Sequence, residues 1–299
     1  MKKFLILAAI LAVFSGCSDA KSKAKARAKT STTTEQSAAP QSSGDAVSQA
    51  AQQISAEAQA AIAACEGGNI DQCNALGVRY LQGDGVAQDV SGAVKAFERA
   101  CNGNQATACY NLGFLLANSN DESGKNAATA AQLFAKACDG KQALGCGALA
   151  QLYRAGKGVA KDDARALGLF EQACGAGDMA SCGYAGFAYQ NGEGTEQNLT
   201  KAVAIYANAC NGKNMVACNN LAYLAQNGIG VTRSAQQALQ LYTMACNGGF
   251  TVGCVNLGYM VERGEGVDVN ISMAKALYKR ACDAGDTKGC QEVARFQGN

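Results

Sequence analysis

Small, aromatic and cysteine residues recur at helical spacing along most of the chain. In six segments an Ala stands eight residues before a Cys and an aromatic residue four before it, with Asp, Asn or Ser twelve before it. Positions i, i+4 and i+8 share one face of an α-helix, and Asp, Asn and Ser side chains cap helix N-termini. The pattern predicts six helices of one kind, here called B helices, which begin after Asp89, Asn126, Asp162, Asn198, Ser234 and Asn270.

A second kind of segment, here called an A helix, precedes each B helix. In it an apolar residue or Ala is followed directly by Gly or Ala, as in Leu76-Gly77. Gly inside a helix costs about 1 kcal/mol relative to Ala, so its recurrence indicates close packing at that position. Most A helices are joined to the next B helix by Gly-x-Gly-Val, and no strand precedes these glycines as a phosphate-binding loop requires. We predict six A/B units, preceded by a half-repeat helix over 46–65 that Asp45 caps and followed by a last A helix over 286–297.

Seven pairs of Cys mark the corners between B and A helices. Each pair has seven intervening residues, and successive pairs are offset by 36 residues, once by 37. A Gly within three positions of the first Cys is a helix stop, because Gly accepts the left-handed conformation. Asn69, Asp178, Asn214 and Asp286 follow four residues after the first Cys, where they can cap an A helix. We predict disulfides that act as clasps across these corners, between the pairs Cys65/Cys73, Cys101/Cys109, Cys138/Cys146, Cys174/Cys182, Cys210/Cys218, Cys246/Cys254 and Cys282/Cys290.

The composition argues against several kinds of metal site, catalytic site and partner. Zinc sites need closer ligand pairs than these, such as Cys-x2-Cys, and the chain of 299 residues has no His. The absence of His removes His metal sites and Ser-His-Asp triads. The 26 basic and 24 acidic residues nearly balance, which does not favour nucleic acid as a partner. We expect no cofactor and no metal, and the paired thiols indicate an oxidising compartment.

The N-terminus predicts export and anchoring. Lys2 and Lys3 precede an apolar run over 4–14 that is too short to span a bilayer, so residues 1–16 are typical of a signal peptide. The sequence around Cys17, Phe-Ser-Gly-Cys, resembles the lipobox of bacterial lipoproteins, which implies cleavage before Cys17 and acylation of that residue. Ser18 usually accompanies the outer membrane in such lipoproteins. The alternative is an ordinary secretory signal with an unpaired Cys17. Residues 17–44 are predicted to be a polar tether and 45–299 a repeat domain.

The repeat resembles a known family. An A helix with Leu-Gly and Tyr80, then Gly-x-Gly-Val, then a B helix that ends in Ala-Cys resembles the Sel1-like repeat, a relative of the tetratricopeptide repeat. With one Cys pair per unit, the chain is most similar to the Helicobacter cysteine-rich proteins. The resemblance implies an all-α fold, a right-handed α/α superhelical solenoid with A helices on its concave wall. The segment 118–126 departs from the pattern, since it lacks Gly-x-Gly-Val and carries the extra residue.

Four A helices carry amides and rings on the face opposite the Leu/Gly pair. These residues stand two and five positions after the second Cys. In related superhelices such amides bind an extended peptide backbone and such rings form apolar pockets. The alternative is that each ring packs on the adjacent A helix, and that the Asn nine positions after the Cys only ends its helix. The candidate ligand-binding residues are Asn111, Phe114, Tyr184, Phe187, Asn220, Tyr223, Asn256 and Tyr259.

Two functions follow from these features. The first is a monomeric, lipid-anchored scaffold, periplasmic or surface-exposed, that binds a protein or peptide on its concave face. The second is β-lactam binding or hydrolysis, because members of the cysteine-rich family are often described as β-lactamase-like. Ser272-Met-Ala-Lys275 and Ser18-Asp-Ala-Lys21 fit Ser-x-x-Lys, but the companion motifs Ser-Asp-Asn and Lys-Thr-Gly are missing. We therefore expect a binding protein and assign no catalytic residue.

Overall fold

The structure is a computed structural model that describes residues 56–119 and 124–297. The chain divides into two compact units, 1–46 and 47–299, and every described residue belongs to the second. The predicted signal peptide, Cys17, the tether and the capping residue Asp45 lie outside the described residues.

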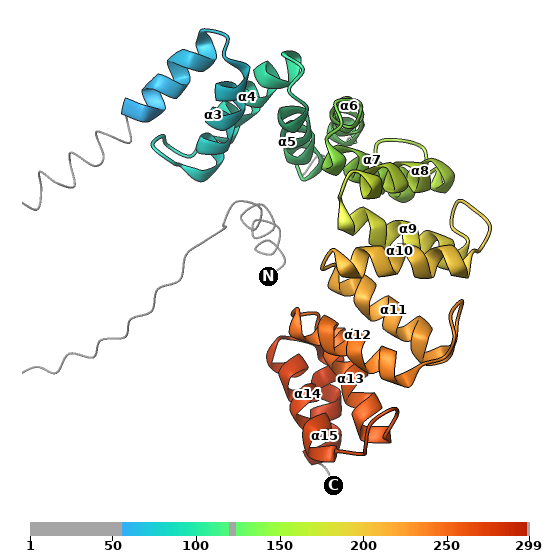
Figure 1. The fold of residues 1–299 in the computed structure, drawn as a ribbon. Coiled ribbons are helices and arrows are strands. Elements are labelled where there is room, and N and C mark those ends of the chain that lie inside the picture. The colour runs from blue at the N-terminus through green and yellow to red at the C-terminus, as the bar shows by residue number, and fades with distance from the viewer. Residues whose placement is uncertain (1–55, 120–123, 298–299) are drawn as a thin grey trace, which may run out of the picture. The chain divides into compact units, whose positions relative to one another are not determined.

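All regular structure in the described ranges is helical, and the helices alternate between the two predicted kinds (Figure 1). A helix covers residues 56–66 and ends one residue beyond the half-repeat helix predicted over 46–65. The A helices are α3 (Ile70–Gln82), α5 (Ala106–Ala117), α7 (Ala143–Ala155), α9 (Met179–Asn191), α11 (Met215–Asn227), α13 (Thr251–Arg263) and α15 (Thr287–Gln297). The B helices are α4 (Val90–Asn102), α6 (Lys125–Asp139), α8 (Asp163–Gly175), α10 (Leu199–Asn211), α12 (Ala235–Asn247) and α14 (Ile271–Asp283).

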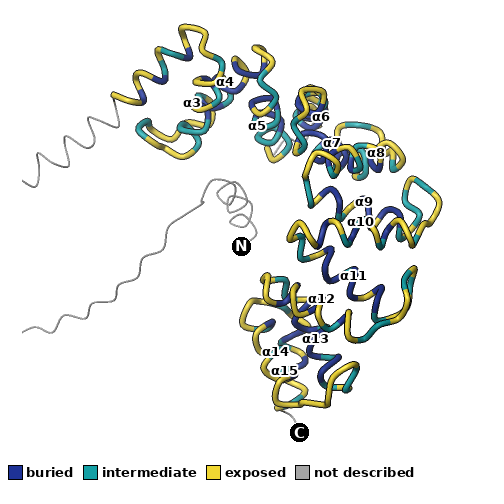
Figure 2. Tube along the Cα trace, in the orientation of Figure 1, coloured by how far each residue is buried: buried dark blue, intermediate teal, exposed yellow. Residues whose placement is uncertain are grey.

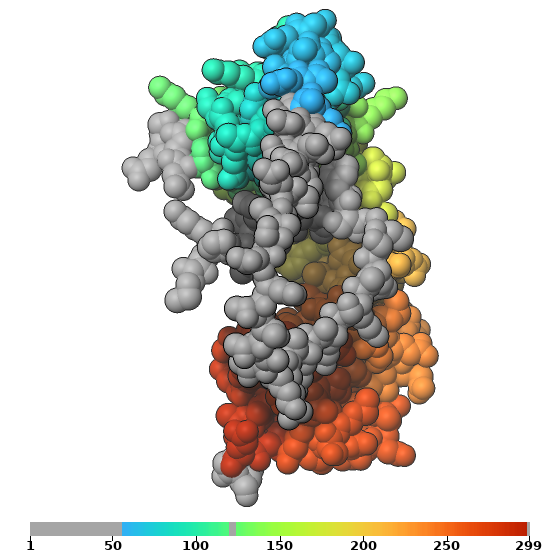
Figure 3. Space-filling model, turned by 90° about the vertical axis from the view of Figure 1, so that its left-hand side faces the viewer, coloured from blue at the N-terminus to red at the C-terminus, as the bar shows by residue number. Residues whose placement is uncertain are grey.

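Each helix from α3 onward packs against the next one along the chain, and consecutive A helices such as α9 and α11 also touch. Buried positions recur on the sides of the helices that face their neighbours (Figure 2), and the repeats follow one another in sequence order in the space-filling view as well (Figure 3). A solenoid buries its core in slices of this kind, between adjacent repeats. The predicted all-α solenoid is confirmed.

Side-chain caps begin most helices. Five of the six predicted B-helix caps are confirmed, for example Asp89, whose carboxylate accepts a hydrogen bond from the Ser91 backbone N–H at 2.9 Å. The prediction for Asn126 is wrong, because α6 begins at Lys125 with Gly124 as its N-cap. Asn126 instead donates to the Ser119 hydroxyl at 2.7 Å. The departure at 118–126 thus displaces the start of its B helix.

Where an A-to-B loop carries Gly-x-Gly, its two glycines have different structural roles. The first ends the A helix in the left-handed conformation, as Gly192 does with φ 73°. The second is also left-handed, and it lies on the first turn of the preceding B helix. A Cβ on Gly194 would overlap the backbone of Asp163 in α8, and one on Gly158 would overlap that of Ala127 in α6. The loop glycines therefore allow two backbones to approach closely.

The glycines at the Cys corners were predicted to be left-handed helix stops, and for several of them this is wrong. Gly103 has φ −78° and Gly212 also −78°. The left-handed residue is the next one along the chain, Asn104 and Lys213, each with φ 64°. A Cβ on Gly103 would lie 2.5 Å from the Ile70 side chain at the start of α3. Gly is required there because the ends of two helices touch.

Rings of the B helices fill the space left by the A-helix glycines. A Cβ on Gly77 would lie 2.5 Å from the Phe97 ring, and one on Gly186 would lie 2.8 Å from the Tyr206 ring. Both rings are fully buried, as are the Ala residues four positions before them. The predicted core face of the B helices is confirmed, and the close contact at the A-helix Gly is ring against backbone.

Candidate peptide-binding face

Seven disulfides connect the end of each B helix, or of the first described helix, to the A helix that follows. All seven predicted pairs are bonded, with Cα–Cα distances of 4.4 to 4.6 Å. Each bond joins residues eight positions apart and so limits the angle between two successive helices. The candidate face consists of A helices that these bonds hold in place.

The second Cys of most pairs is also a core residue, in addition to its predicted role in a corner clasp. Cys73, Cys109 and Cys218 have no exposed surface, and Cys254 is nearly as buried. The first two belong to one hydrophobic cluster and the other two to another. The physical reason is helical spacing, because the second Cys stands three residues before the buried apolar residue of its A helix, as Cys73 does before Leu76. These sulfur atoms therefore pack inside the solenoid and are not accessible to a ligand.

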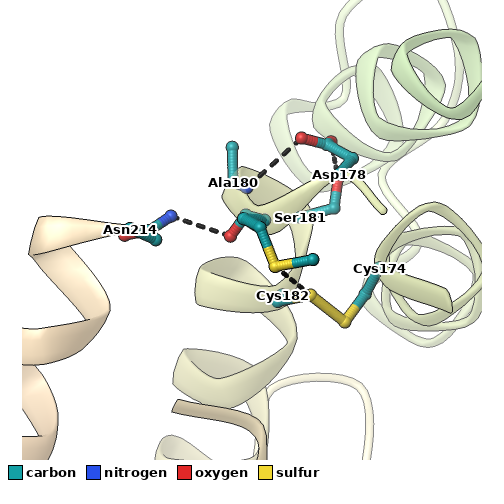
Figure 4. Close-up of a disulfide and its surroundings, with 7 residues drawn as sticks. Cys174, Asp178, Ala180, Ser181, Cys182 and Asn214 are labelled. Carbon is teal, nitrogen blue, oxygen red and sulfur yellow. Dashed lines mark hydrogen bonds between the residues drawn. A yellow bond between two sulfur atoms is a disulfide. The ribbon is translucent and has the colours of Figure 1, made fainter. Parts of the chain in front are cut away.

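Figure 4 shows the corner of Cys174 and Cys182 and its connection to the next unit. The Asp178 carboxylate caps α9 by accepting hydrogen bonds from the Ala180 N–H at 3.2 Å and the Ser181 hydroxyl at 2.5 Å. The Asn214 amide at the start of α11 donates to the carbonyl of Met179, the first residue of α9, at 2.7 Å. Hydrogen bonds of this kind therefore join the first turns of neighbouring A helices.

Amides form a second set of bonds between A helices. Asn111 donates to Asn74 at 3.0 Å, and Asn256 donates to Asn219 at 2.9 Å. In each pair the donor stands two positions after its second Cys and the acceptor one position after the second Cys of an earlier unit. Asn220 differs, because its oxygen accepts from the adjacent Asn219 at 3.5 Å. The candidate amides are thus partly used in hydrogen bonds within the solenoid. Their partners Asn74 and Asn219 were not predicted from the sequence, although each directly follows a Cys.

The candidate rings differ in exposure. Tyr184, Phe187 and Tyr223 are 39%, 40% and 48% exposed. Phe114 is half-buried, and Tyr259 is also half-buried and donates a hydrogen bond to a carboxylate of α15. The free aromatic surface is therefore concentrated on α9 and α11, which are adjacent A helices.

The Asn residues at the ends of A helices have a local role. Asn118, Asn191 and Asn227 donate to the carbonyl four residues earlier, at 2.7, 3.0 and 2.8 Å. Each side chain satisfies one of the carbonyls that a helix C-terminus leaves without a partner. The interpretation that these Asn residues end their helices is confirmed.

A shallow hollow lies between α7, α8 and α9. Tyr184 stacks on Phe170 with ring centroids 5.0 Å apart, and the Arg154 guanidinium lies 5.1 Å from the centroid of the Tyr184 ring. The hollow has about 10 Å³ of enclosed space, which suffices for about one water, whereas small-molecule pockets hold roughly 300 Å³ or more. Its lining is Arg154, Asp163, Ala166, Leu167, Phe170, Tyr184, Phe187, Ala188 and Glu193.

In the last three A/B units, the residue eight positions after the second Cys faces the B-helix ring. Where the B helix carries Tyr, its hydroxyl donates to this residue, as from Tyr206 to Gln190 at 2.9 Å. The corresponding bonds of the next two units, from Tyr242 to Gln226 and from Tyr278 to Glu262, measure 3.1 and 2.7 Å. Burial raises the pKa of Tyr206 to about 12, so the hydroxyl remains a donor at neutral pH. These bonds are part of the core and not of a catalytic site.

Charged groups cluster on the last described helices. Arg295 contacts Glu262 at 2.7 Å and Glu292 at 2.8 Å. Burial alone would raise the pKa of Glu262, but hydrogen bonds from Arg295 and Tyr278 lower it below the usual 4.5. Burial likewise opposes ionisation of Glu292, and hydrogen bonds from Tyr259, Arg295 and Lys288 lower its pKa. Both carboxylates are therefore ionised and satisfied at neutral pH, as in a structural network.

The Ser-x-x-Lys segment of α14 forms no enclosed site. Ser272 and Lys275 are both exposed in the first turns of the helix. The Lys275 ammonium lies 4.8 Å from the centroid of the Phe296 ring on α15. The second such segment, at Ser18 and Lys21, lies outside the described residues. No group of three or more Cys, Asp or Glu in the described part of the chain is arranged to hold a metal ion.

These features define a repeat protein, a solenoid of helix pairs with one disulfide per repeat. Six consecutive segments match the Sel1 repeat, over residues 73–105, 106–141, 143–178, 179–214, 216–250 and 251–286. The chain therefore belongs to the Sel1 repeat family, and Sel1 repeats generally mediate protein interactions. The seven disulfides indicate an extracellular or periplasmic location. Over the ranges that the structure describes, no helix has the length and apolar character needed to cross a bilayer.

Two solved structures show the same fold. A protective antigen of uropathogenic Escherichia coli strains, with an SLR fold, is 26% identical with a TM-score of 0.73, over 81% of this chain and 52% of its own. A Sel1 repeat protein from Oxalobacter formigenes is 22% identical with a TM-score of 0.68, over 76% of this chain and 65% of its own. Cysteine-rich protein B of Helicobacter pylori is 27% identical with a TM-score of 0.37, over 44% of this chain and 94% of its own. This chain thus spans about half of the first structure and just under two thirds of the second. No curated protein matches the chain.

Proposed function

We propose that this protein is a scaffold that binds an extended peptide or a protein segment on the concave face formed by its A helices. The observation that carries the proposal is the group of exposed rings on adjacent A helices, Tyr184 and Phe187 on α9 and Tyr223 on α11. Aromatic side chains supply much of the energy of protein interfaces, and a rigid surface loses little entropy on binding. The disulfides and the bonds between A helices provide that rigidity.

The amides support the same proposal. Asn256 and Asn111 each use the amide nitrogen to bind another A helix, which fixes the side chain and leaves its carbonyl oxygen to accept from a ligand. An amide oxygen has two lone pairs and accepts hydrogen bonds from backbone N–H groups. Neighbouring helices lie about 8 to 10 Å apart, which corresponds to roughly three residues of an extended peptide.

The experiment uses the full disulfide-bonded protein and a displayed library of random peptides. Phe187→Ala with Tyr223→Ala is expected to weaken binding of the selected peptides at least about ten-fold, because the two rings would form the apolar contact. Val216→Ala with Val252→Ala is the matched control, since these side chains are 47% and 42% exposed but stand elsewhere on their A helices. Equal losses in the two double variants, or no selected peptides, would contradict the proposal.

The proposed scaffold acts in the cell envelope, on the periplasmic or outer side, with acylated Cys17 as its anchor and residues 17–44 as its tether. The resemblance of residues 14–17 to a lipobox and the disulfides support this part. Cys17→Ala is expected to move the protein from the membrane fraction to the soluble fraction of fractionated cells. Unchanged membrane association would contradict the anchor and leave the peptide-binding proposal intact.

A further inference from the structure

Arg154 differs from every residue at its position in the other repeats. The position eight residues after the second Cys holds Leu or Ala in the first two units and Gln, Gln and Glu in the last three. Each polar residue of the last three accepts a hydrogen bond from the Tyr of its B helix. Arg154 instead lines the same hollow as Phe170, which has no hydroxyl. Arg154 is therefore the only cation at this position of the A helices, and the ring of its own B helix offers it no hydrogen-bond acceptor.

The guanidinium of Arg154 is incompletely satisfied. One of its terminal nitrogens donates to the neutral Gln151 side chain at 3.0 Å. Its Nε–H is buried and has no acceptor among the described residues. No carboxylate of the described chain lies within ion-pairing distance of Arg154, although Asp163 and Glu193 line the same hollow. A ligand would not reach the buried Nε–H, but the terminal nitrogens of the guanidinium can bind a carboxylate as a two-pronged donor.

The neighbouring charges restrict the way in which an anion could approach. Asp163 is paired with Lys161 at 3.0 Å, so its charge is largely compensated. Glu193, in the loop after α9, has no ion pair in the described chain. An incoming carboxylate would thus be attracted by Arg154 and repelled by Glu193.

The place of Arg154 in the row of A helices favours a side chain over a chain terminus. Phe114 and Asn111 lie on α5 before it, and Tyr184 and Phe187 lie on α9 after it. A peptide that crosses these helices would continue on both sides of Arg154. The carboxylate would therefore belong to an internal Asp or Glu. At roughly three residues per helix, an apolar residue three positions away would reach the exposed rings of α9.

We propose that Arg154 makes the candidate face selective for extended peptides in which an acidic residue and an apolar residue stand three positions apart, in either order. This inference rests on the proposed peptide binding and specifies its ligand. Arg154 binds the carboxylate, and Phe187 contacts the apolar residue.

The test uses the full-length disulfide-bonded protein and arrays of acetylated, amidated dodecapeptides. Each peptide carries a central Asp or Glu with Leu or Phe three positions away, and its partner peptide carries Asn or Gln at the acidic position. The wild-type protein is expected to bind the acidic peptides about ten-fold tighter or more. Arg154→Gln is expected to remove this difference, and Arg154→Lys to retain part of it, since the ammonium keeps the charge but not the fork.

Two further variants separate charge from position. Arg165→Gln removes a cation that also lies over a ring, 4.5 Å from the centroid of Tyr153, but that does not line the hollow, so the preference should persist. Glu193→Gln should strengthen binding of the acidic peptides about two-fold or more, because it removes the repelling charge.

Peptides that bind equally with Asp or Asn would overturn the inference while the proposed function stands. A preference that survives Arg154→Gln, or one that appears only for peptides with a free C-terminal carboxylate, would also overturn it. If no peptide of the array or of the random library binds, the proposed function fails as well.

Discussion

At the scale of single residues, two positions change together from repeat to repeat, namely the B-helix ring and its partner on the A helix. The first three B helices carry Phe at the core ring position and the last three carry Tyr. Tyr occurs where the partner on the A helix is Gln or Glu, and Phe occurs opposite Leu81 and Ala117. A buried hydroxyl needs an acceptor, so one change requires the other. Arg154 opposite Phe170 is the exception, and it is the residue to which we assign ligand recognition.

The pairing predicts a coupling between Tyr206 and Gln190. Tyr206→Phe removes the donor of a 2.9 Å hydrogen bond and should lower the free energy of unfolding by about 1 kcal/mol. Adding Gln190→Leu should recover most of this loss, because Leu81 opposite Phe97 shows that an apolar pair fits the position. Urea unfolding of the two single variants and the double variant gives the coupling energy. Strictly additive losses would contradict the pairing.

At the scale of elements, a loop from one unit covers the first turn of the preceding B helix. The second loop glycine permits this contact. Val90, the first residue of α4, is 57% exposed, and the connection that follows in the next unit, 118–126, lacks Gly-x-Gly-Val. In α10 the equivalent residue is Leu199, which lies against Gly230 and is half-buried. The loops thus contribute to the stacking of successive units.

Two Gly→Ala changes with opposite expected effects on stability test this contact. Gly194 has φ 71°, and a Cβ there would overlap the backbone of Asp163, so Gly194→Ala should destabilise the protein by about 1 to 2 kcal/mol or more. Gly168 lies in α8 with no atom near its added Cβ, so Gly168→Ala should stabilise the protein by up to about 1 kcal/mol. Thermal unfolding compares the two variants. A stabilising Gly194→Ala would show that the loop is not in contact with α8.

Much of the structure of single elements could be predicted from the sequence, because it is local. Five B-helix caps and seven Cys pairs depend on residues within one helix or one corner. The left-handed glycines at the corners were wrong because a distant contact decides their conformation. Gly103 is constrained by Ile70, which is 33 positions away, and single-residue conformational preference carries no information about such a neighbour. The bonds between Asn residues of successive A helices were missed for the same reason, whereas the burial of Cys73 and Cys109 follows from helical spacing that is present in the sequence.

At the scale of the whole molecule, the fully buried residues of the described chain fall into separate clusters. One cluster of buried residues runs from Ala61 to Ala137, and a larger one runs from Ala150 to Ala281. Smaller clusters lie between them, including one that contains a disulfide, Cys138 with Cys146. In a solenoid each repeat contacts only its neighbours, so stability is a sum of local terms. The division between the two larger clusters follows the irregular connection at 118–126.

This division predicts unfolding in two steps. The helices up to α6 should lose hydrogen-exchange protection at lower denaturant concentration than those from α7 onward, because their buried cluster is smaller. Removing the disulfide at the junction with Cys138→Ala and Cys146→Ala should lower local stability by about 2 to 3 kcal/mol and separate the steps further. The matched change at Cys282 and Cys290 should leave the exchange of the first helices unchanged. A single cooperative loss of protection along the chain would contradict the prediction.

The sequence by itself determined the repeat, the two kinds of helix, the disulfide pairs and the solenoid, because each depends on spacing within about 36 residues and on local conformational preference. The tertiary structure alone decided which residues of the A-helix face are free. It showed that Asn111 and Asn256 bind other A helices, and that Tyr184, Phe187 and Tyr223 remain exposed. It also showed that the one Arg in the row of partners to the B-helix rings lacks an anionic partner among the described residues. Exposure and hydrogen-bond satisfaction depend on contacts between repeats, and the pattern within one repeat cannot specify them.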